Sequence, residues 1–235
     1  VSLLRGALRD GGMEHAVQTF ARRGYRFGET PQAARPSDAP IATERSAREL
    51  ADDGSWERAL EAFQALADTT SLTGADWQAW GNAALCAGFP EQGVAPLERA
   101  VATFEAAGQR AQAAHAALLL TNTKVEGREL AVAKGWHQRA LTLLKSEPEG
   151  KEHGFATWLA ARLALFEGLL DECQAHARAA LAIAERIGDP DLHCLGLAYQ
   201  GHILIAQGEV RRGLSMHDEA GAGALAGRPG PWVSG

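Results

Sequence analysis

The pattern of apolar and polar residues changes several times along the first forty positions. Residues 1–12 place apolar side chains three and four positions apart and end in two glycines, which predicts a short helix. Val17–Phe20 and Tyr25–Phe27 then alternate around a glycine-containing turn and predict a β-hairpin. Residues 28–40 are polar and include three prolines, so they predict a linker between domains.

From residue 41 onward, glycines recur where paired helices would turn. They are Gly54, Gly88, Gly127, Gly168 and Gly208, at spacings of 34, 39, 41 and 40 residues. Seven residues before these glycines stand Ala47, Gly81, Leu120, Ala161 and Gly201, and five after them stand Ala59, Gly93, Val132, Cys173 and Gly213. Small residues let two helix axes approach closely, so these positions, small in four of five cases each, predict the helix crossings.

This period predicts about five antiparallel helix pairs, over residues 41–73, 74–107, 108–146, 149–188 and 190–227. Composition agrees, because alanine and leucine dominate, 46% of the residues are apolar, and β-branched residues are sparse beyond the first 30 positions. The sequence therefore predicts an all-α protein, apart from the hairpin, with one repeat domain over residues 41–235.

Two short motifs resemble the tetratricopeptide repeat. Trp77-x-x-Trp80-Gly81-x-x-Ala84 followed by Gly88 is similar to the first helix of that repeat, and Ala59-x-x-x-Phe63 is similar to its second helix. The resemblance implies a superhelix of helix pairs whose concave groove binds a partner protein or peptide, without enzymatic activity.

The stretch from about residue 46 to the end also resembles the helical-repeat region of bacterial LuxR-type regulators and of some modular signalling proteins. Gly135-Trp136, Glu147–Gly154 and Leu163–Gly168 carry this resemblance. It implies an interaction module in transcription regulation and signal transduction. The alternative is the sensor or scaffold part of a larger signalling enzyme, such as a nucleotide cyclase or kinase, whose catalytic part is not in this sequence.

Residues 1–27 resemble the end of an OmpR/PhoB-type winged-helix DNA-binding domain. Leu4-Arg5-x-x-Leu8-x-Asp10 is similar to the end of its recognition helix, and Val17–Phe20 with Gly24–Phe27 to its wing. The resemblance implies DNA contacts by Arg5, Arg22 and Arg23. Since the preceding helices and sheet are missing, we expect a truncated remnant that binds DNA only if the domain is completed elsewhere.

Charge supports this division of the chain. Residues 1–36 carry six arginines against three acidic residues, a charge of +3, and because the whole chain carries -6, the remainder carries -9. A polyanion would be attracted to the first part alone.

The repeat register also predicts the residues of the partner groove. In tetratricopeptide arrays the residue just after the small crossing residue of each first helix points into the groove, and the stripe extends four residues earlier. The predicted groove residues are Arg48, Gln78, Asn82, Thr121, Trp158, Arg162 and His202. Arginine and amide side chains suit an extended peptide or a carboxylate-bearing tail, whereas ordinary solvated positions are the competing interpretation.

The sequence carries no motif of a cofactor or catalytic site. Cys173-x-x-His176 with His193-Cys194 is the one metal candidate. Against it, Cys173 already serves as a small crossing residue and free cysteines are often simply buried, so we expect neither metal nor cofactor. Three widely spaced cysteines and the lack of a membrane span or signal peptide favour the cytoplasm. Oligomeric state cannot be inferred from the sequence.

Overall fold

A computed structural model describes residues 17–20, 24–27, 46–67 and 69–226 of the chain. The chain divides into two compact units, residues 1–44 and 45–235. Each unit is described by itself.

The first unit contains a two-stranded hairpin. Strands β1 (Val17–Phe20) and β2 (Gly24–Phe27) pair antiparallel, with Val17 opposite Phe27. The predicted helix of residues 1–12, the linker of residues 28–40 and the proposed DNA contacts Arg5, Arg22 and Arg23 lie outside the described residues.

The second unit is helical throughout its described residues, which confirms the all-α prediction for this part of the chain. Its helices are α2 (Ala47–Asp52), α3 (Trp56–Ala67), α4 (Gly74–Cys86), α5 (Pro90–Ala106), α6 (Arg110–Glu126), α7 (Leu130–Leu144), α8 (Lys151–Phe166), α9 (Leu170–Ile187), α10 (Pro190–Ala206) and α11 (Val210–Ala226). None of these helices combines the length and apolar character that crossing a bilayer requires.

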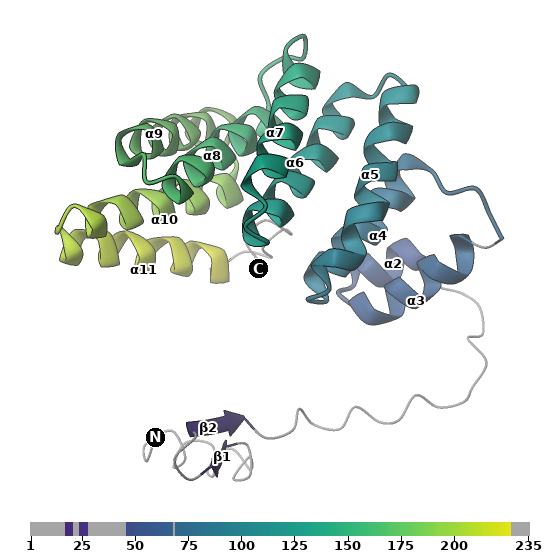
Figure 1. Ribbon diagram of the computed structural model, residues 1–235, viewed down its shortest axis with the longest axis horizontal. Coiled ribbons are helices and arrows are strands. Elements are labelled where there is room, and N and C mark those ends of the chain that lie inside the picture. Colours follow the sequence, from purple (N-terminus) through teal and green to yellow (C-terminus); the bar gives the residue numbers. More distant parts are fainter. Residues whose placement is uncertain (1–16, 21–23, 28–45, 68, 227–235) are drawn as a thin grey trace. The chain divides into compact units, whose positions relative to one another are not determined.

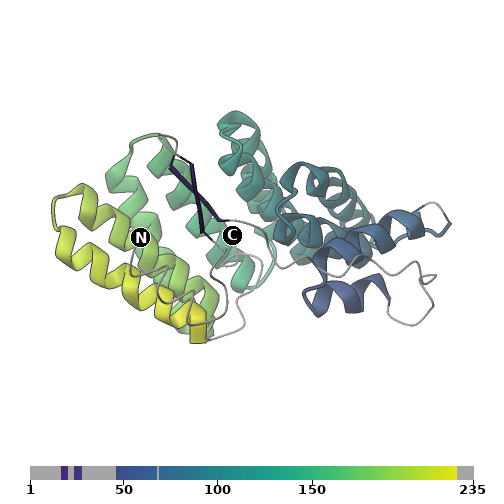
Figure 2. The same ribbon diagram turned by 90° about the horizontal axis from the view of Figure 1, so that it is seen from below.

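Consecutive helices form antiparallel pairs that follow one another along the chain (Figures 1 and 2). The pairs are α2/α3, α4/α5, α6/α7, α8/α9 and α10/α11, and the second helix of each pair contacts the first helix of the next. First helices also contact each other directly at α2/α4, α6/α8 and α8/α10. Among the described residues no comparable contact joins α4 to α6.

Side chains and prolines fix where several helices begin. Ser46 accepts a hydrogen bond from the Glu49 backbone and Thr73 accepts one from the Asp76 backbone, and each acidic side chain bonds back to the capping residue. These capping boxes satisfy backbone N–H groups that have no partner within the first turn of a helix. Pro90 is the first residue of α5, a position that prolines favour because the N–H group they lack has no partner there.

Each helix pair turns through one residue with positive φ. Four of these residues are glycines, Gly54, Gly88, Gly168 and Gly208, but in the α6/α7 pair Arg128 has φ 59° and Gly127 remains in the helical region. The Glu129 N–H donates to the Lys124 carbonyl, as Phe89 does to Ala84 and Leu169 to Ala164, so Arg128 occupies the same C-terminal cap position. The prediction that Gly127 is this turn residue was wrong by one position.

Counting from Arg128 changes the crossing residues of the third pair. They are Thr121 and Ala133, which are buried, in place of the predicted Leu120 and Val132, the latter 45% exposed. The turn residues are then 34, 40, 40 and 40 positions apart, and every crossing position holds Gly, Ala, Cys or Thr. The steric argument for small residues at the crossings therefore applies to all five pairs.

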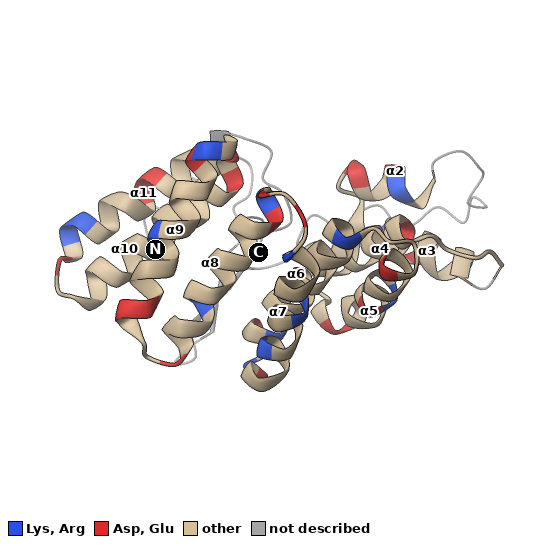
Figure 3. Cartoon of the chain, turned by 90° about the horizontal axis from the view of Figure 1, so that it is seen from above, with Lys and Arg blue, Asp and Glu red and all other residues tan. Residues whose placement is uncertain are grey.

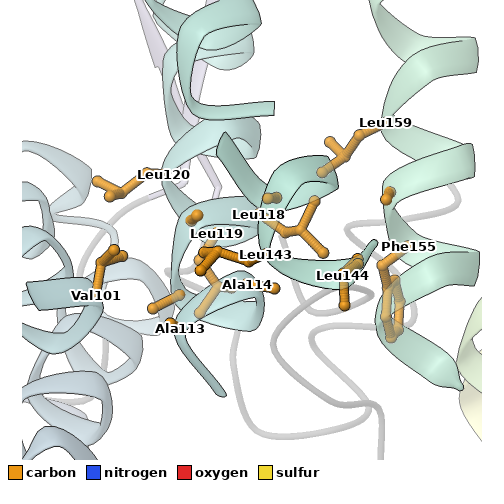
Figure 4. Packing of buried hydrophobic residues seen from close by; sticks show 14 of the residues in the cluster. Val101, Ala113, Ala114, Leu118, Leu119, Leu120, Leu143, Leu144, Phe155 and Leu159 are labelled. Atoms are coloured by element: carbon orange, nitrogen blue, oxygen red, sulfur yellow. The ribbon is translucent and has the colours of Figure 1, made fainter. Parts of the chain in front are cut away.

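The largest core cluster centres on α6 (Figure 4). Leu118, Leu119 and Leu120 are consecutive and buried, which a helix permits only when neighbours cover it on several sides. Helices α5, α7 and α8 supply these neighbours, including Phe155 and Leu159 of α8. Helix α6 therefore leaves only a narrow strip open to solvent.

Candidate partner-binding surface

Three of the predicted groove residues, Arg48, Gln78 and Asn82, line one open cavity of about 650 Å³. It lies where α2 and α4 face the beginning of α6, at the step where α4 and α6 pack less closely than other successive first helices. Gln109 and Gln112 line it from the α6 side. Five amide or guanidinium side chains thus line a cavity as large as typical ligand sites.

The Asn82 side chain has an unfulfilled hydrogen-bonding group. It is half-buried, and its Oδ1 atom, which solvent does not reach, has no hydrogen-bond partner. A buried acceptor left without a donor costs about 1–3 kcal/mol. A rotation of the Asn82 amide would bring this oxygen into the cavity, where a ligand N–H or O–H group could bond it.

The cation at the cavity is already neutralised. Arg48 Nε donates to Asp76 Oδ1 at 2.5 Å, and Arg48 Nη2 reaches Thr73 Oγ1 at 3.4 Å. Burial raises the pKa of the Asp76 carboxyl, but hydrogen bonds from Arg48 and Thr73 outweigh burial and hold that pKa below its usual value. With Asp52 also at the rim, the cavity has no excess positive charge.

Arg162, another predicted groove residue, bridges α8 and α6. Its Nη1 atom donates to the Asn122 side-chain oxygen and lies 3.3 Å from Glu126 Oε1, and Asn122 Nδ2 donates to the same Glu126 oxygen at 3.1 Å. Its guanidinium carbon lies 5.7 Å from the Trp158 ring centre, and its buried Nε has no hydrogen-bond partner. This guanidinium is already held by one carboxylate.

Two of the predicted groove residues do not line a surface. Thr121 is fully buried, and its hydroxyl donates to the Ala117 carbonyl at 2.9 Å. Trp158 is 2% exposed and belongs to the main core cluster. Both predictions were wrong. Thr121 failed because the turn lies one residue later, which gives its expected position to the half-buried Asn122.

Edge-on and tilted ring contacts connect α8 to the last helix pair. The Tyr199 ring contacts Trp158 edge-on at 5.7 Å between ring centres and His202 at 5.6 Å, and His202 meets His217 of α11 edge-on at 4.4 Å. Burial raises the pKa of Tyr199 to about 12, so its hydroxyl stays protonated. His202 is exposed to solvent.

Sequence reasoning missed Asn122, Gln109, Gln112 and Tyr199. A signal existed for Asn122, because it is forty residues after Asn82 and forty before Arg162. Gln109 and Gln112 had none, since they lie at the opposite end of a first helix from the crossing residue that set the register.

Metal and thiol chemistry finds no support in the described part of the chain. No group of three or more His, Cys, Asp or Glu side chains there is arranged to hold a metal ion. The four residues of the metal candidate, Cys173, His176, His193 and Cys194, therefore do not form such a group. Both cysteines are buried and free, and burial raises the pKa of each thiol.

Comparison with known proteins gives a fold and no family. No protein-family model matches the chain, and no curated protein matches it either. Among solved structures, it is similar to the crystal structure of BtubC (BKLC) from P. vanneervenii, with a TM-score of 0.57. The two chains are 16% identical, and the match covers 77% of each. This likeness supports a helical repeat-like arrangement and carries no information about ligand or activity.

Proposed function

We propose that residues 46–226 form a tetratricopeptide-like array that binds an extended segment of a partner protein along its first helices, without catalysis. The observation that carries this proposal is the open cavity of about 650 Å³ lined by the amide side chains of Gln78, Asn82, Gln109 and Gln112. An amide offers both a donor and an acceptor, which matches the C=O and N–H groups of a peptide backbone.

The charges favour recognition of the peptide backbone over recognition of a carboxylate tail. Arg48 is paired with Asp76, and Arg162 is shared by Asn122 and Glu126, so neither guanidinium is free for an anionic ligand. Basic and acidic segments are also interspersed along the helices (Figure 3). Binding should therefore depend little on ionic strength.

We further propose that this array serves bacterial transcription regulation in the cytoplasm. The sequence resemblances to LuxR-type regulators and to the OmpR/PhoB-type wing support this role. The array would recruit or sense a partner, while DNA would be contacted only through a winged helix completed by other residues.

Selection of peptides from a random display library against the whole chain tests the binding proposal. Peptides that bind the wild type should bind the Asn82→Ala variant about three- to tenfold more weakly, since one hydrogen bond is lost. Gln92→Ala, at an exposed position of α5, is the matched control and should bind normally.

Two further measurements keep this test decisive. Circular dichroism should show that Asn82→Ala unfolds at the wild-type temperature, and affinity should change by less than about threefold between low and high salt. The proposal is refuted if no peptide is enriched, or if the enriched peptides bind Asn82→Ala as tightly as the wild type.

A further inference from the structure

A second cavity, of about 260 Å³, lies between the second helices α7 and α9 and over α8. Its floor includes Ala160 and Ala164 of α8. Successive helical residues are rotated by about 100°, which places these alanines on the opposite side of α8 from Trp158 and Arg162. This site is therefore separate from the proposed partner-binding surface.

The α7 wall supplies a neutral hydrogen-bond acceptor. His137 lies with its Nε2 atom 2.8 Å from the Ala156 carbonyl oxygen, and a carbonyl can only accept, so Nε2 carries the proton. Burial lowers the pKa of His137 and outweighs the hydrogen bond to Ala156, which raises that pKa, so the neutral ring is favoured. Nδ1 of His137 is then an acceptor, with no other hydrogen bond among the described residues.

The α9 wall supplies a carboxylate with no cationic partner in the described structure. At the rim, Lys134 of α7 forms an ion pair with Glu167, which cancels both charges. Glu172 lines the same cavity without a salt bridge, and His176 follows it one helical turn later. The site thus combines one uncompensated carboxylate, two imidazoles and an apolar floor.

We propose that this cavity binds an alkylguanidinium group, either of free arginine or of an arginine side chain in a partner protein. A guanidinium is a planar cation with five N–H donors, so it can bond the Glu172 carboxylate while it donates to Nδ1 of His137. Its aliphatic stem can lie over Leu163 and the alanines of α8. An ammonium group is a compact and more strongly hydrated charge, so it should bind these acceptors less well.

Titration of the whole chain with ethylguanidinium, followed by NMR of the histidine side chains and backbone amides, tests this inference. We expect saturable shifts at His137, Glu172 and His176, and weaker binding of ethylammonium. Glu172→Gln should weaken ethylguanidinium binding at least about tenfold, because it removes a charge-assisted bond. Glu185→Gln, at an exposed and unpaired position of the same helix, is the matched control.

A second titration separates the two sources of the group. Tighter binding of free L-arginine than of N-acetylarginine amide indicates a small-molecule ligand, and the reverse order indicates a side chain of a protein. Three results overturn the inference: no saturable shift, equal binding of ethylammonium and ethylguanidinium, or equal binding by Glu172→Gln and the wild type. Because the site does not include Asn82, peptide binding can fail without affecting this result.

Discussion

Substitution of Gly213 by alanine tests whether glycine is required where α10 and α11 cross. A Cβ atom at Gly213 would lie 2.5 Å from the Gly201 carbonyl oxygen and 2.6 Å from Ile205 Cγ1, well inside contact distance. The carbonyl belongs to the backbone and cannot rotate away, so the helices must separate, at a cost of about 1–3 kcal/mol. Alanine in a helix gains about 1 kcal/mol over glycine. The net effect should lie between no change and a loss of about 2 kcal/mol.

Gly221→Ala, in the same helix, is the matched control. A Cβ there meets no atom within 4 Å, so the substitution should stabilise the protein by up to about 1 kcal/mol. The decisive quantity is the difference between the two variants, about 1–3 kcal/mol, measured by urea unfolding and by hydrogen exchange of the α11 amides. Hydrogen exchange reports the local opening of α11, which matters because a terminal helix pair can open without global unfolding. Equal stabilisation by both substitutions would refute the close-crossing argument.

Two further predictions concern the core and the response to acid. Trp158→Ala should lower the free energy of unfolding by about 3–5 kcal/mol, since Trp158 is a core residue and not a groove residue; a loss below about 1 kcal/mol in urea unfolding would contradict that placement. Burial lowers the pKa of His137 and of His217 from 6.5, so the unfolded chain binds protons that the folded chain does not, and stability should fall as pH decreases from about 7 to 5. His137→Gln should make this fall shallower, and equal slopes for variant and wild type would rule out the His137 contribution.

The helical-repeat fold was predictable because glycine and other small residues recur at a regular spacing. Close packing of each helix pair requires small residues at those positions. The sequence prediction misplaced the third turn because Arg128 has a left-handed backbone conformation that residues other than glycine rarely adopt. Gly127 beside it has the residue type expected there, so composition favoured the wrong neighbour. The constant spacing to Gly168 and Gly208 was the better guide.

The candidate surface was harder to predict, for a physical reason. A stripe on one helix says which side chains point the same way, but not which neighbour covers them. Trp158 shares a stripe with Arg162, yet α10 packs on α8 and its Tyr199 meets the indole ring. Gln78 occupies the equivalent place on α4 and stays open, because α6 does not close over it.

The forty-residue interval between Gly88, Arg128, Gly168 and Gly208 has a consequence for how such a chain can change length. A segment cut at two of these turns contains a complete second helix, the following first helix and the same cap geometry at both ends. Because contacts run mainly between adjacent helix pairs, the helices on either side of such a segment meet equivalent surfaces whether the chain holds one copy of the segment or two. Duplication or loss of forty residues is therefore the change in gene length that this architecture tolerates best, and shorter insertions would have to be absorbed in the turns.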